Sequence, residues 1–279
     1  MFSFKSPLHS LRKKKYFQSL LKSKWNRPIK CNLGLPFKVA LRPFTHASIL
    51  LKPKSLEPEI QILIRDIIAF LEKAQDKGHF YDIGANVGWY SWLVRSITKK
   101  REILAFEPDP LNLELLAMTQ AHAQLKNFKI ESVALSNHAG NKVFFQDSIT
   151  SATGSIESDG KPWIERYLGL TSKQINVQTC LMDHYLTEHR RPSLIKIDVE
   201  GHELAVLNGG FETLRHKPLL VIESFPPRQY KVARLLDDLG YELTDADRRN
   251  PIGEKTTNLF AWHPDGPLSR NIIQRILHS

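Results

Sequence analysis

The chain has 279 residues, of which 42% are apolar, 24% charged and 9% aromatic. This composition is typical of a folded globular protein and excludes a disordered or fibrous one. No apolar run approaches the ~18 residues that a membrane-spanning helix needs. The two cysteines, Cys31 and Cys180, are too few for a disulfide-rich scaffold or a four-cysteine zinc site. They favour the reducing cytosol as the location.

Positive charge is concentrated at the start of the chain. Residues 1–56 contain 13 lysines and arginines and no acid, whereas the remainder has 26 basic and 29 acidic residues. We therefore expect a basic N-terminal arm at 1–56, a globular domain at 57–263 and a C-terminal tail at 264–279. The net charge of +10 therefore comes from the arm, and it says little about the fold of the globular domain.

The arm has the pattern of a membrane-surface segment. If residues 8–25 are helical, one face collects the large apolar side chains of Phe17, Leu20, Leu21 and Trp25. A basic amphipathic helix of this kind binds anionic lipid, so we expect a cytoplasmic protein whose residues 1–30 contact a membrane surface. The alternatives are a solvated arm without a partner and a transit peptide. A nucleic-acid tether is disfavoured because no recognition motif accompanies the charge.

The globular part is expected to begin with a helix and a strand–turn–helix unit. Isoleucines and leucines recur with i, i+3, i+4 and i+7 spacing over 60–71, which predicts a helix. A β-prone run at 79–83 then enters a glycine-containing turn, and helical spacing follows over 88–98. Such a unit opens an α/β fold of the nucleotide-binding type.

The turn itself, D-x-G-x-N-x-G over 82–88, limits the ligand. Asn86 and Trp89 stand where the dinucleotide fingerprint requires its second and third glycines, and no phosphate loop occurs elsewhere. These differences argue against NAD, FAD and ATP. S-adenosylmethionine has an ammonium and a sulfonium but no phosphate, and would suit the acid Asp82 at the strand end.

The next strand supports the same ligand. A run at 102–107 ends in Glu107, which lies 19 residues after Gly88 and precedes the break Pro108-Asp109-Pro110. In dinucleotide-binding folds an acid about 20 residues past the turn accepts hydrogen bonds from the ribose hydroxyls. Glu107 is therefore the predicted ribose ligand.

The rest of the chain alternates strands and helices. Further strands are expected at 127–133, 142–146, 175–181, 193–199, 218–223, 240–244 and 257–263. Helices are expected at 110–122, 202–215 and 227–239. This alternation predicts a parallel sheet with right-handed crossovers. No helix separates the last two strands, which predicts a terminal antiparallel hairpin.

Four motifs in succession resemble the FkbM family of S-adenosylmethionine-dependent methyltransferases. They are Y-D-I-G-A-N-V-G at 81–88, F-E-P at 106–108, V-A-L-S at 133–136 and I-K-I-D-V-E-G-H-E at 195–203. The resemblance covers about half of the chain, near residues 78–225. It implies an α/β, class I (Rossmann-like) methyltransferase fold: a mostly parallel seven-stranded sheet with helices on both faces. It also implies methyl transfer to a hydroxyl of a sugar or polyketide.

The resemblance also implies roles for particular residues. The methionine end of the cofactor would be contacted by residues of the first motif, namely Asp82, Gly84, Asn86 and Gly88. Glu107 would hold the ribose, and the backbone of Ser132, Val133 and Ala134 would lie near the adenine. The segment 146–173 is polar and long, and we expect it to form a substrate-side insertion. The acceptor therefore cannot be transferred from the family.

Four further residues are candidates for catalysis. Strand alternation places residues 196, 198 and 200 on one face, and ligands of open α/β sheets bind at the carboxyl ends of the strands. Asp198 and Glu200 should lie at that end, with Glu223 at the end of the next strand. His202 is expected at a helix start, where the helix dipole favours its neutral form.

These groups allow three interpretations. A carboxylate or His202 could be the general base that deprotonates a hydroxyl during attack. Asp198 and Glu223 could instead hold Mg²⁺, which would lower the pKa of the hydroxyl. Glu200 and Glu203 could simply cap the following helix. We favour the base over the metal and expect Lys196 to pair with a neighbouring acid.

The sequence as a whole predicts an S-adenosylmethionine-dependent O-methyltransferase that acts on a sugar hydroxyl of a glycan or glycolipid. One alternative is an RNA or protein methyltransferase that is recruited by the basic arm. Another is a binding module without catalytic activity, although such a module would be expected to lose the acids that this chain retains.

Overall fold

The computed structural model describes residues 19–20, 23–53, 56–147, 154–156, 172–187, 190–247 and 249–278. Most of the expected arm helix at 8–25 and most of the expected insertion at 146–173 lie outside these residues. No helix in the described ranges is long and apolar enough to cross a membrane.

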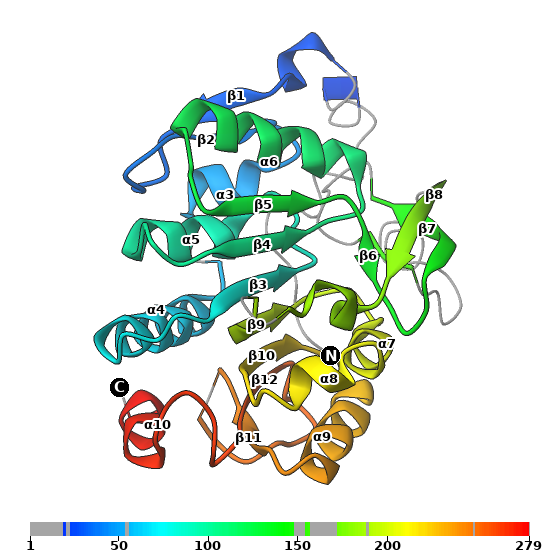
Figure 1. The fold of residues 1–279 in the computed structure, drawn as a ribbon. Coiled ribbons are helices and arrows are strands. Elements are labelled where there is room, and N and C mark those ends of the chain that lie inside the picture. Colours follow the sequence, from blue (N-terminus) through cyan, green and yellow to red (C-terminus); the bar gives the residue numbers. More distant parts are fainter. Residues whose placement is uncertain are drawn as a thin grey trace.

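A seven-stranded sheet forms the centre of the molecule (Figure 1). Its strand order is β11-β12-β10-β9-β3-β4-β5. The strands are β3 (His79–Ile83), β4 (Ile103–Phe106), β5 (Phe128–Glu131), β9 (Pro192–Ile197), β10 (Leu219–Glu223), β11 (Glu242–Asp245) and β12 (Asn258–Trp262). Neighbours from β5 to β10 are parallel, whereas β12 runs antiparallel to both β10 and β11. The predicted mostly parallel sheet and terminal hairpin are therefore confirmed.

Helices cover both faces of this sheet (Figure 1). One face packs against α4 (Pro58–Lys73), α5 (Trp89–Ile97), α6 (Pro110–Ala123) and α10 (Arg270–Leu277). The other face packs against α7 (Glu203–Asn208), α8 (Phe211–Leu214), α9 (Arg228–Asp238) and the 3-10 turn η4 (Met182–Tyr185). Because the sheet is covered on both sides, its central strands are buried along their whole length. This explains their continuous apolar character.

Two expected elements differ from the prediction. The expected helix at 202–215 is divided into α7 and α8 at Gly209 and Gly210, where two glycines in a row weaken a helix. The expected strand at 127–133 ends at Glu131. The chain then joins a separate three-stranded sheet of β6 (Ala134–Leu135), β8 (Lys173–Cys180) and β7 (Gly140–Gln146), in that order.

Segments on both sides of the expected 57–263 domain belong to the same core. The short hairpin of β1 (Ile29–Cys31) and β2 (Val39–Leu41) buries all three residues of β2 against α6. The Ala40 backbone N–H donates to Thr119 Oγ1 at 2.9 Å. At the other end, Ile273 and Ile276 of α10 are fully buried in that core. The packed unit therefore extends beyond residues 57–263 in both directions.

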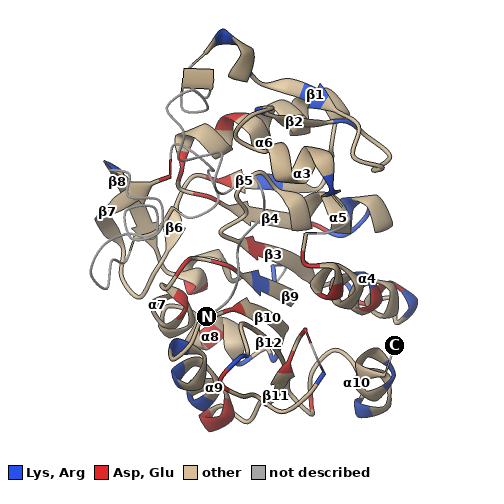
Figure 2. Ribbon diagram, turned by 180° about the vertical axis from the view of Figure 1, so that it is seen from behind, with Lys and Arg blue, Asp and Glu red and all other residues tan. Residues whose placement is uncertain are grey.

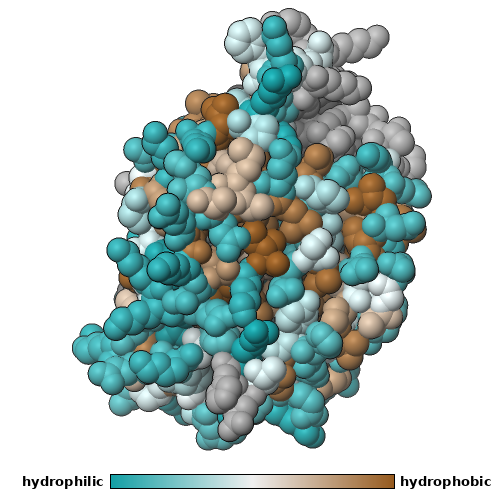
Figure 3. All heavy atoms as spheres, turned by 45° about the horizontal axis from the view of Figure 1, so that its top comes forward, coloured by the Kyte–Doolittle hydropathy of each residue, from teal (hydrophilic) through white to brown (hydrophobic). Residues whose placement is uncertain are grey.

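The segment before α4 also exposes large apolar side chains. It contains η1 (Lys24–Asn26) and α3 (Ala47–Leu51), in which Trp25 and Leu51 are each 70% exposed. Figure 3 shows the face of the molecule that comes forward when the top of Figure 1 is tilted toward the viewer. This face is mostly hydrophilic, and its hydrophobic residues gather near the middle.

Candidate functional site

The turn after β3 brings the ends of three strands together. The Gly84 and Ala85 backbone N–H groups both donate to the Phe106 carbonyl of β4 at 3.0 Å. Gly84 has φ +78°, and a Cβ there would lie 1.8 Å from the Asp198 carbonyl oxygen beyond β9. Only glycine allows this approach, which explains the glycine that follows the strand.

Glu107 follows β4 and faces the same turn. Its Oε2 accepts the Asn86 backbone N–H at 2.7 Å, and its Oε1 accepts the Asp109 backbone N–H at 2.8 Å. The side chain is buried, and burial raises the pKa of Glu107 to about 8, although both hydrogen bonds oppose that shift. The turn and the acid predicted from the sequence are thus joined directly.

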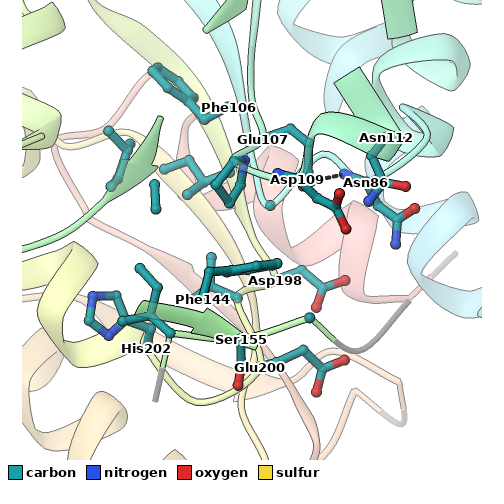
Figure 4. A pocket seen from close by; sticks show the side chains of 18 of the residues that line it. Asn86, Phe106, Glu107, Asp109, Asn112, Phe144, Ser155, Asp198, Glu200 and His202 are labelled. Atoms are coloured by element: carbon teal, nitrogen blue, oxygen red, sulfur yellow. Dashed lines mark hydrogen bonds between the residues drawn. The ribbon is translucent and has the colours of Figure 1, made fainter. Parts of the chain in front are cut away.

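These groups line a cleft of ≈ 590 Å³ that is open to solvent (Figure 4). One wall is apolar and includes Phe106, Val133, Ala134, Leu135, Phe144 and Ile156. The polar side includes Asn86, Glu107, Asp109, Asn112, Asp198 and Glu200. The residues described around the cleft include no lysine or arginine. This lining fits S-adenosylmethionine, because the acids suit cationic groups and ribose hydroxyls and the apolar wall suits a purine.

The residues predicted to bind the cofactor divide into two groups. Gly84, Asn86, Glu107, Val133 and Ala134 line the cleft. Asp82, Gly88 and Ser132 do not appear in its lining.

Asp82 instead connects β3 to α5. Its Oδ2 accepts the Ser91 backbone N–H at 2.9 Å and the Ser91 hydroxyl at 2.6 Å. Burial raises the pKa of Asp82 to about 6, against the effect of these bonds. Gly88, with φ +84°, precedes α5, and a Cβ there would contact Trp92 and Leu116. Asp82 and Gly88 therefore support the conformation of the turn and do not line the cleft.

A carboxylate cluster lies at the ends of β9 and β10. Asp198, Glu200 and Glu223 each offer one carboxylate oxygen, and these three atoms lie within 4.8 Å of one another. All three side chains are half-buried, and Asp198 and Glu200 line the cleft. We call these three residues the carboxylate cluster. Oxygen ligands in this arrangement could hold a divalent cation.

Lys196 of β9 is a fully buried lysine next to the carboxylate cluster. Its Nζ is 3.4 Å from Asp198 Oδ2 and 5.2 Å from the centre of the Tyr90 ring, and its side chain is fully buried. In the sheet, Lys196 of β9 lies in register with Asp82 of β3, and Figure 2 shows basic and acidic positions on these neighbouring strands. Burial disfavours its charge, but Asp198, Glu57, Glu223 and Asp82 outweigh burial and raise its pKa. The expected pairing of Lys196 with an acid is present.

The three carboxyl groups differ in how readily they ionise. Burial alone raises the pKa of Asp198, but Lys196 and a hydrogen bond with Glu223 lower it below its ordinary value. Burial and the Asp198 charge raise the pKa of both Glu200 and Glu223 well above the ordinary value. Asp198, paired with Lys196, is therefore the member of the carboxylate cluster whose ionisation is most favoured.

His202 and Glu203 have other partners. His202 Nε2 lies 3.0 Å from Ser136 Oγ, and Figure 4 shows its ring on the opposite side from the carboxyl groups of Asp198 and Glu200. Glu203 Oε1 accepts the Gly201 backbone N–H at 2.7 Å. The helix-capping interpretation thus fits Glu203, whereas Glu200 belongs to the carboxylate cluster.

Sequence reasoning missed several residues of the cleft. Asp109 begins α6 by accepting the Leu111 backbone N–H at 2.8 Å, and it also accepts a hydrogen bond from Gln146 at 2.7 Å. The break at 108–110 was a signal for this cap. Phe144 and Ser155 come from the three-stranded sheet and its continuation. No local pattern marks them, because only the fold brings them to the cleft.

Comparison with known proteins agrees with this geometry. Residues 82–246 match the family model of the methyltransferase FkbM domain. The hexuronic acid methyltransferase AglP of Haloferax volcanii is 26% identical over 190 residues, which cover 66% of this chain and 73% of AglP. The methyltransferase sdnD of Sordaria araneosa is 27% identical over 193 residues, which cover 58% of this chain and 73% of sdnD.

Among solved structures, the METTL16 methyltransferase domain aligns with 94% of this chain and 82% of its own length. Its sequence identity is 14% and the TM-score is 0.46. The family model, in contrast, matches more than half of the sequence and includes the glycine turn, Glu107 and the carboxylate cluster. The chain therefore belongs to the FkbM family and is an S-adenosylmethionine-dependent methyltransferase.

Proposed function

We propose that the enzyme methylates a hydroxyl of a sugar in a glycan or glycolipid, with Asp198 as the general base. The observation that carries this proposal is the Asp198 carboxylate, paired with a buried lysine at 3.4 Å, on the cleft that contains the cofactor turn. The relative that is named as a hexuronic acid methyltransferase supports a sugar acceptor.

The residues that would hold S-adenosylmethionine follow from the lining of the cleft. Glu107 would accept hydrogen bonds from the ribose hydroxyls. The turn at 84–86 would contact the methionine part of the cofactor, and Val133 and Ala134 would contact the adenine. When bound, S-adenosylmethionine supplies an electrophilic methyl group on a sulfonium.

Asp198 suits the proton-transfer role better than its neighbours. A hydroxyl is a poor nucleophile unless its proton leaves as it attacks, so a group with a free lone pair must face it. Lys196 lowers the pKa of Asp198, which favours its carboxylate form, and 29% of the Asp198 side chain is accessible. Glu200 and Glu223 favour their protonated forms, and His202 is buried against Ser136. Asp198 would accept the hydroxyl proton.

A divalent cation is the second mechanism that the carboxylate cluster supports. Three carboxylate oxygens within 4.8 Å could bind Mg²⁺, which would lower the pKa of a coordinated hydroxyl. Dialysis against EDTA, followed by addition of Mg²⁺, separates the two mechanisms. Full activity in EDTA supports the base, whereas loss and recovery with Mg²⁺ supports the cation.

The acceptor is tested by incubating the enzyme with radiolabelled S-adenosylmethionine and a hydrolysed glycan library. We expect label in a sugar product, as an ether that survives mild base. Label that appears only in RNA or protein substrates would contradict the proposed acceptor.

We also propose that the N-terminal arm contacts an anionic membrane surface. Support comes from Trp25, which is 70% exposed next to Lys24, whose Nζ lies 5.9 Å from the Trp25 ring centre. An exposed tryptophan beside basic residues is typical of surface anchors. Binding to vesicles with and without phosphatidylserine tests this contact.

A further inference from the structure

Lys196, next to the carboxylate cluster, faces the side of the sheet that α4 and α5 cover. Leu194, two residues earlier in β9, packs in the core on that side, and alternate residues of a strand share a face. The Lys196 Nζ lies 3.4 Å from Asp198 Oδ2 and 3.5 Å from the Ile197 carbonyl oxygen. Both distances exceed the ~2.7–2.9 Å of a well-formed charge-assisted hydrogen bond. These two contacts therefore fix the direction of the ammonium only weakly.

The ring of Tyr90 also lies against this ammonium. Tyr90 is the second residue of α5, directly after the cofactor turn, and its ring centre is 5.2 Å from Lys196 Nζ. A cation within about 6 Å of the centre of an aromatic ring is attracted to the ring, most strongly where water is excluded. Only 7% of Tyr90 is exposed. The position of the ring therefore limits the position of the ammonium.

Glu57 in turn holds the end of the tyrosine. Its Oε2 accepts a hydrogen bond from the Tyr90 hydroxyl at 2.6 Å, which connects the ring to the start of α4. The Asn258 Nδ2 of β12 lies 3.4 Å from the other oxygen of the same carboxylate. The charge of Glu57 also acts on Lys196. Glu57, Tyr90, Lys196 and Asp198 thus form a connected series that ends in the cleft.

The backbone of Glu57 has an unfavourable conformation. Its φ of 43° and ψ of 61° lie in the left-handed region, which glycine adopts more readily than glutamate. Glu57 occupies the N-cap position of α4, but its side chain does not cap the helix. The hydrogen bond to Tyr90 is the interaction of this side chain that offsets the cost of the backbone conformation.

We propose that Tyr90 and Glu57 are positioning residues for methyl transfer. Glu57 holds the Tyr90 ring against Lys196, and Lys196 holds the Asp198 carboxylate in the cleft. Tyr90 and Glu57 do not line the cleft themselves, so they act through Asp198 and not on the cofactor or the acceptor. This inference rests on the proposed role of Asp198 as the base.

The first experiment measures methyl transfer by Tyr90→Phe and Glu57→Gln, with labelled S-adenosylmethionine and the hydrolysed glycan library. Tyr90→Phe keeps the ring and loses the hydroxyl, whereas Glu57→Gln keeps the shape and loses the charge. In both variants the rate at saturating cofactor should fall by about 5- to 100-fold, because small displacements of a reacting group cost up to about 100-fold. The Kd for S-adenosylhomocysteine, measured by isothermal titration, should not change.

Two matched variants control for the loss of a buried hydroxyl and for the loss of a charge. Tyr241→Phe removes a buried hydroxyl that donates to the Leu214 carbonyl at 3.1 Å, in the core on the other face of the sheet. Glu59→Gln removes an exposed charge from the first turn of α4. Both variants should transfer methyl groups at the wild-type rate.

A double variant distinguishes positioning from a general structural role. If Tyr90 acts through Asp198, adding Tyr90→Phe to Asp198→Asn should not lower the rate further. Losses that multiply in the double variant would overturn the inference. So would wild-type rates in both Tyr90→Phe and Glu57→Gln, or a loss of cofactor affinity as large as the loss of rate.

A second experiment needs no acceptor, because it follows the lysine side chain directly by NMR. In protein with labelled lysine, the Hε signal of Lys196, assigned by its loss in Lys196→Arg, should carry a ring-current shift from Tyr90. This shift should shrink in Glu57→Gln and persist in Glu59→Gln. An unchanged Lys196 signal in Glu57→Gln would overturn the inference.

The two experiments also separate this inference from the proposed function. Full transfer by Asp198→Asn would overturn Asp198 as the base, and the NMR shift would still show whether Glu57 and Tyr90 place Lys196. Loss of transfer in Asp198→Asn alone, with wild-type rates in Tyr90→Phe and Glu57→Gln, would support the base and overturn this inference. A library without any labelled sugar would contradict the proposed acceptor, and the Lys196 signal would then decide this inference.

Discussion

Replacing Glu107 with glutamine should weaken binding of S-adenosylhomocysteine without unfolding the protein. The carboxylate accepts two backbone N–H groups, at 2.7 and 2.8 Å, and lines the cleft at the end of β4, where it could also accept hydrogen bonds from ribose hydroxyls. Glutamine retains one acceptor oxygen and turns the other position into a donor. Hydrogen bonds to a charged group contribute about 1.5–3 kcal/mol, so the expected loss of affinity is roughly 10- to 100-fold.

The pKa of Glu107 adds a pH dependence to this prediction. Ribose hydroxyls donate to the ionised carboxylate, but a pKa of about 8 keeps Glu107 mostly protonated in the free protein at neutral pH. Binding therefore releases a proton below the pKa. The affinity should rise by up to about tenfold per pH unit as the pH approaches 8 and then level off. The glutamine variant should lack this rise.

Isothermal titration between about pH 6.5 and 9, in two buffers of different ionisation enthalpy, measures both effects. Glu212→Gln, which alters an exposed glutamate paired with Arg215, is the matched control and should bind like the wild type. Wild-type affinity in Glu107→Gln would contradict a role for Glu107 in binding the ribose. A pH dependence that persists in the variant would show that another group releases the proton.

Three further predictions concern folding. Gly84→Ala should lower the free energy of unfolding, measured in urea, by more than about 3 kcal/mol, because the added Cβ would overlap the Asp198 carbonyl. Gly253→Ala is the control. Its Cβ would meet open space, so its free energy of unfolding should change little. As the pH rises from 4 to 6, the free energy of unfolding of the wild type should fall by up to about 3 kcal/mol relative to that of Asp82→Asn. The reason is that Asp82, with a pKa raised to about 6, is harder to ionise in the folded protein than in the unfolded chain. Parallel plots of unfolding free energy against pH for the two proteins would contradict this prediction. Deleting residues 1–22 should leave the melting temperature unchanged. Deleting residues 1–30 should lower the free energy of unfolding by about 2–5 kcal/mol, because it removes Asn26, whose Oδ1 accepts hydrogen bonds from the Phe44 and Thr45 backbone N–H groups. Vesicle binding that survives both deletions would contradict the proposed role of the arm.

Much of the central fold could be predicted from the sequence. The β3 turn, β4 with Glu107, and the final hairpin all have strong local signals: alternation of strand and helix patterns, glycines at positive φ, and a hairpin without a helix. The carboxylate cluster was also predictable, because parallel strands end at one edge of the sheet.

The remaining features depend on contacts between distant parts of the chain. Nothing local indicates that Ser136 lies against His202, or that Asp82 is bound by Ser91 rather than lining the cleft. The separate sheet of β6, β7 and β8 has ordinary strand patterns, and only pairing decides which sheet a strand joins. The packing of β2 and α10 into the core likewise follows from buried side chains whose partners are far away in sequence.

The identity of the base decides the central proposal, and Asp198→Asn tests it most directly. This change removes the charge next to Lys196 while nearly preserving shape, so the cleft should remain intact. With an acceptor that the wild type methylates and labelled S-adenosylmethionine, we predict that kcat falls by ~10²–10⁴, while the Kd for S-adenosylhomocysteine changes little. Full turnover by Asp198→Asn on an acceptor that the wild type methylates would contradict the assignment of Asp198 as the base.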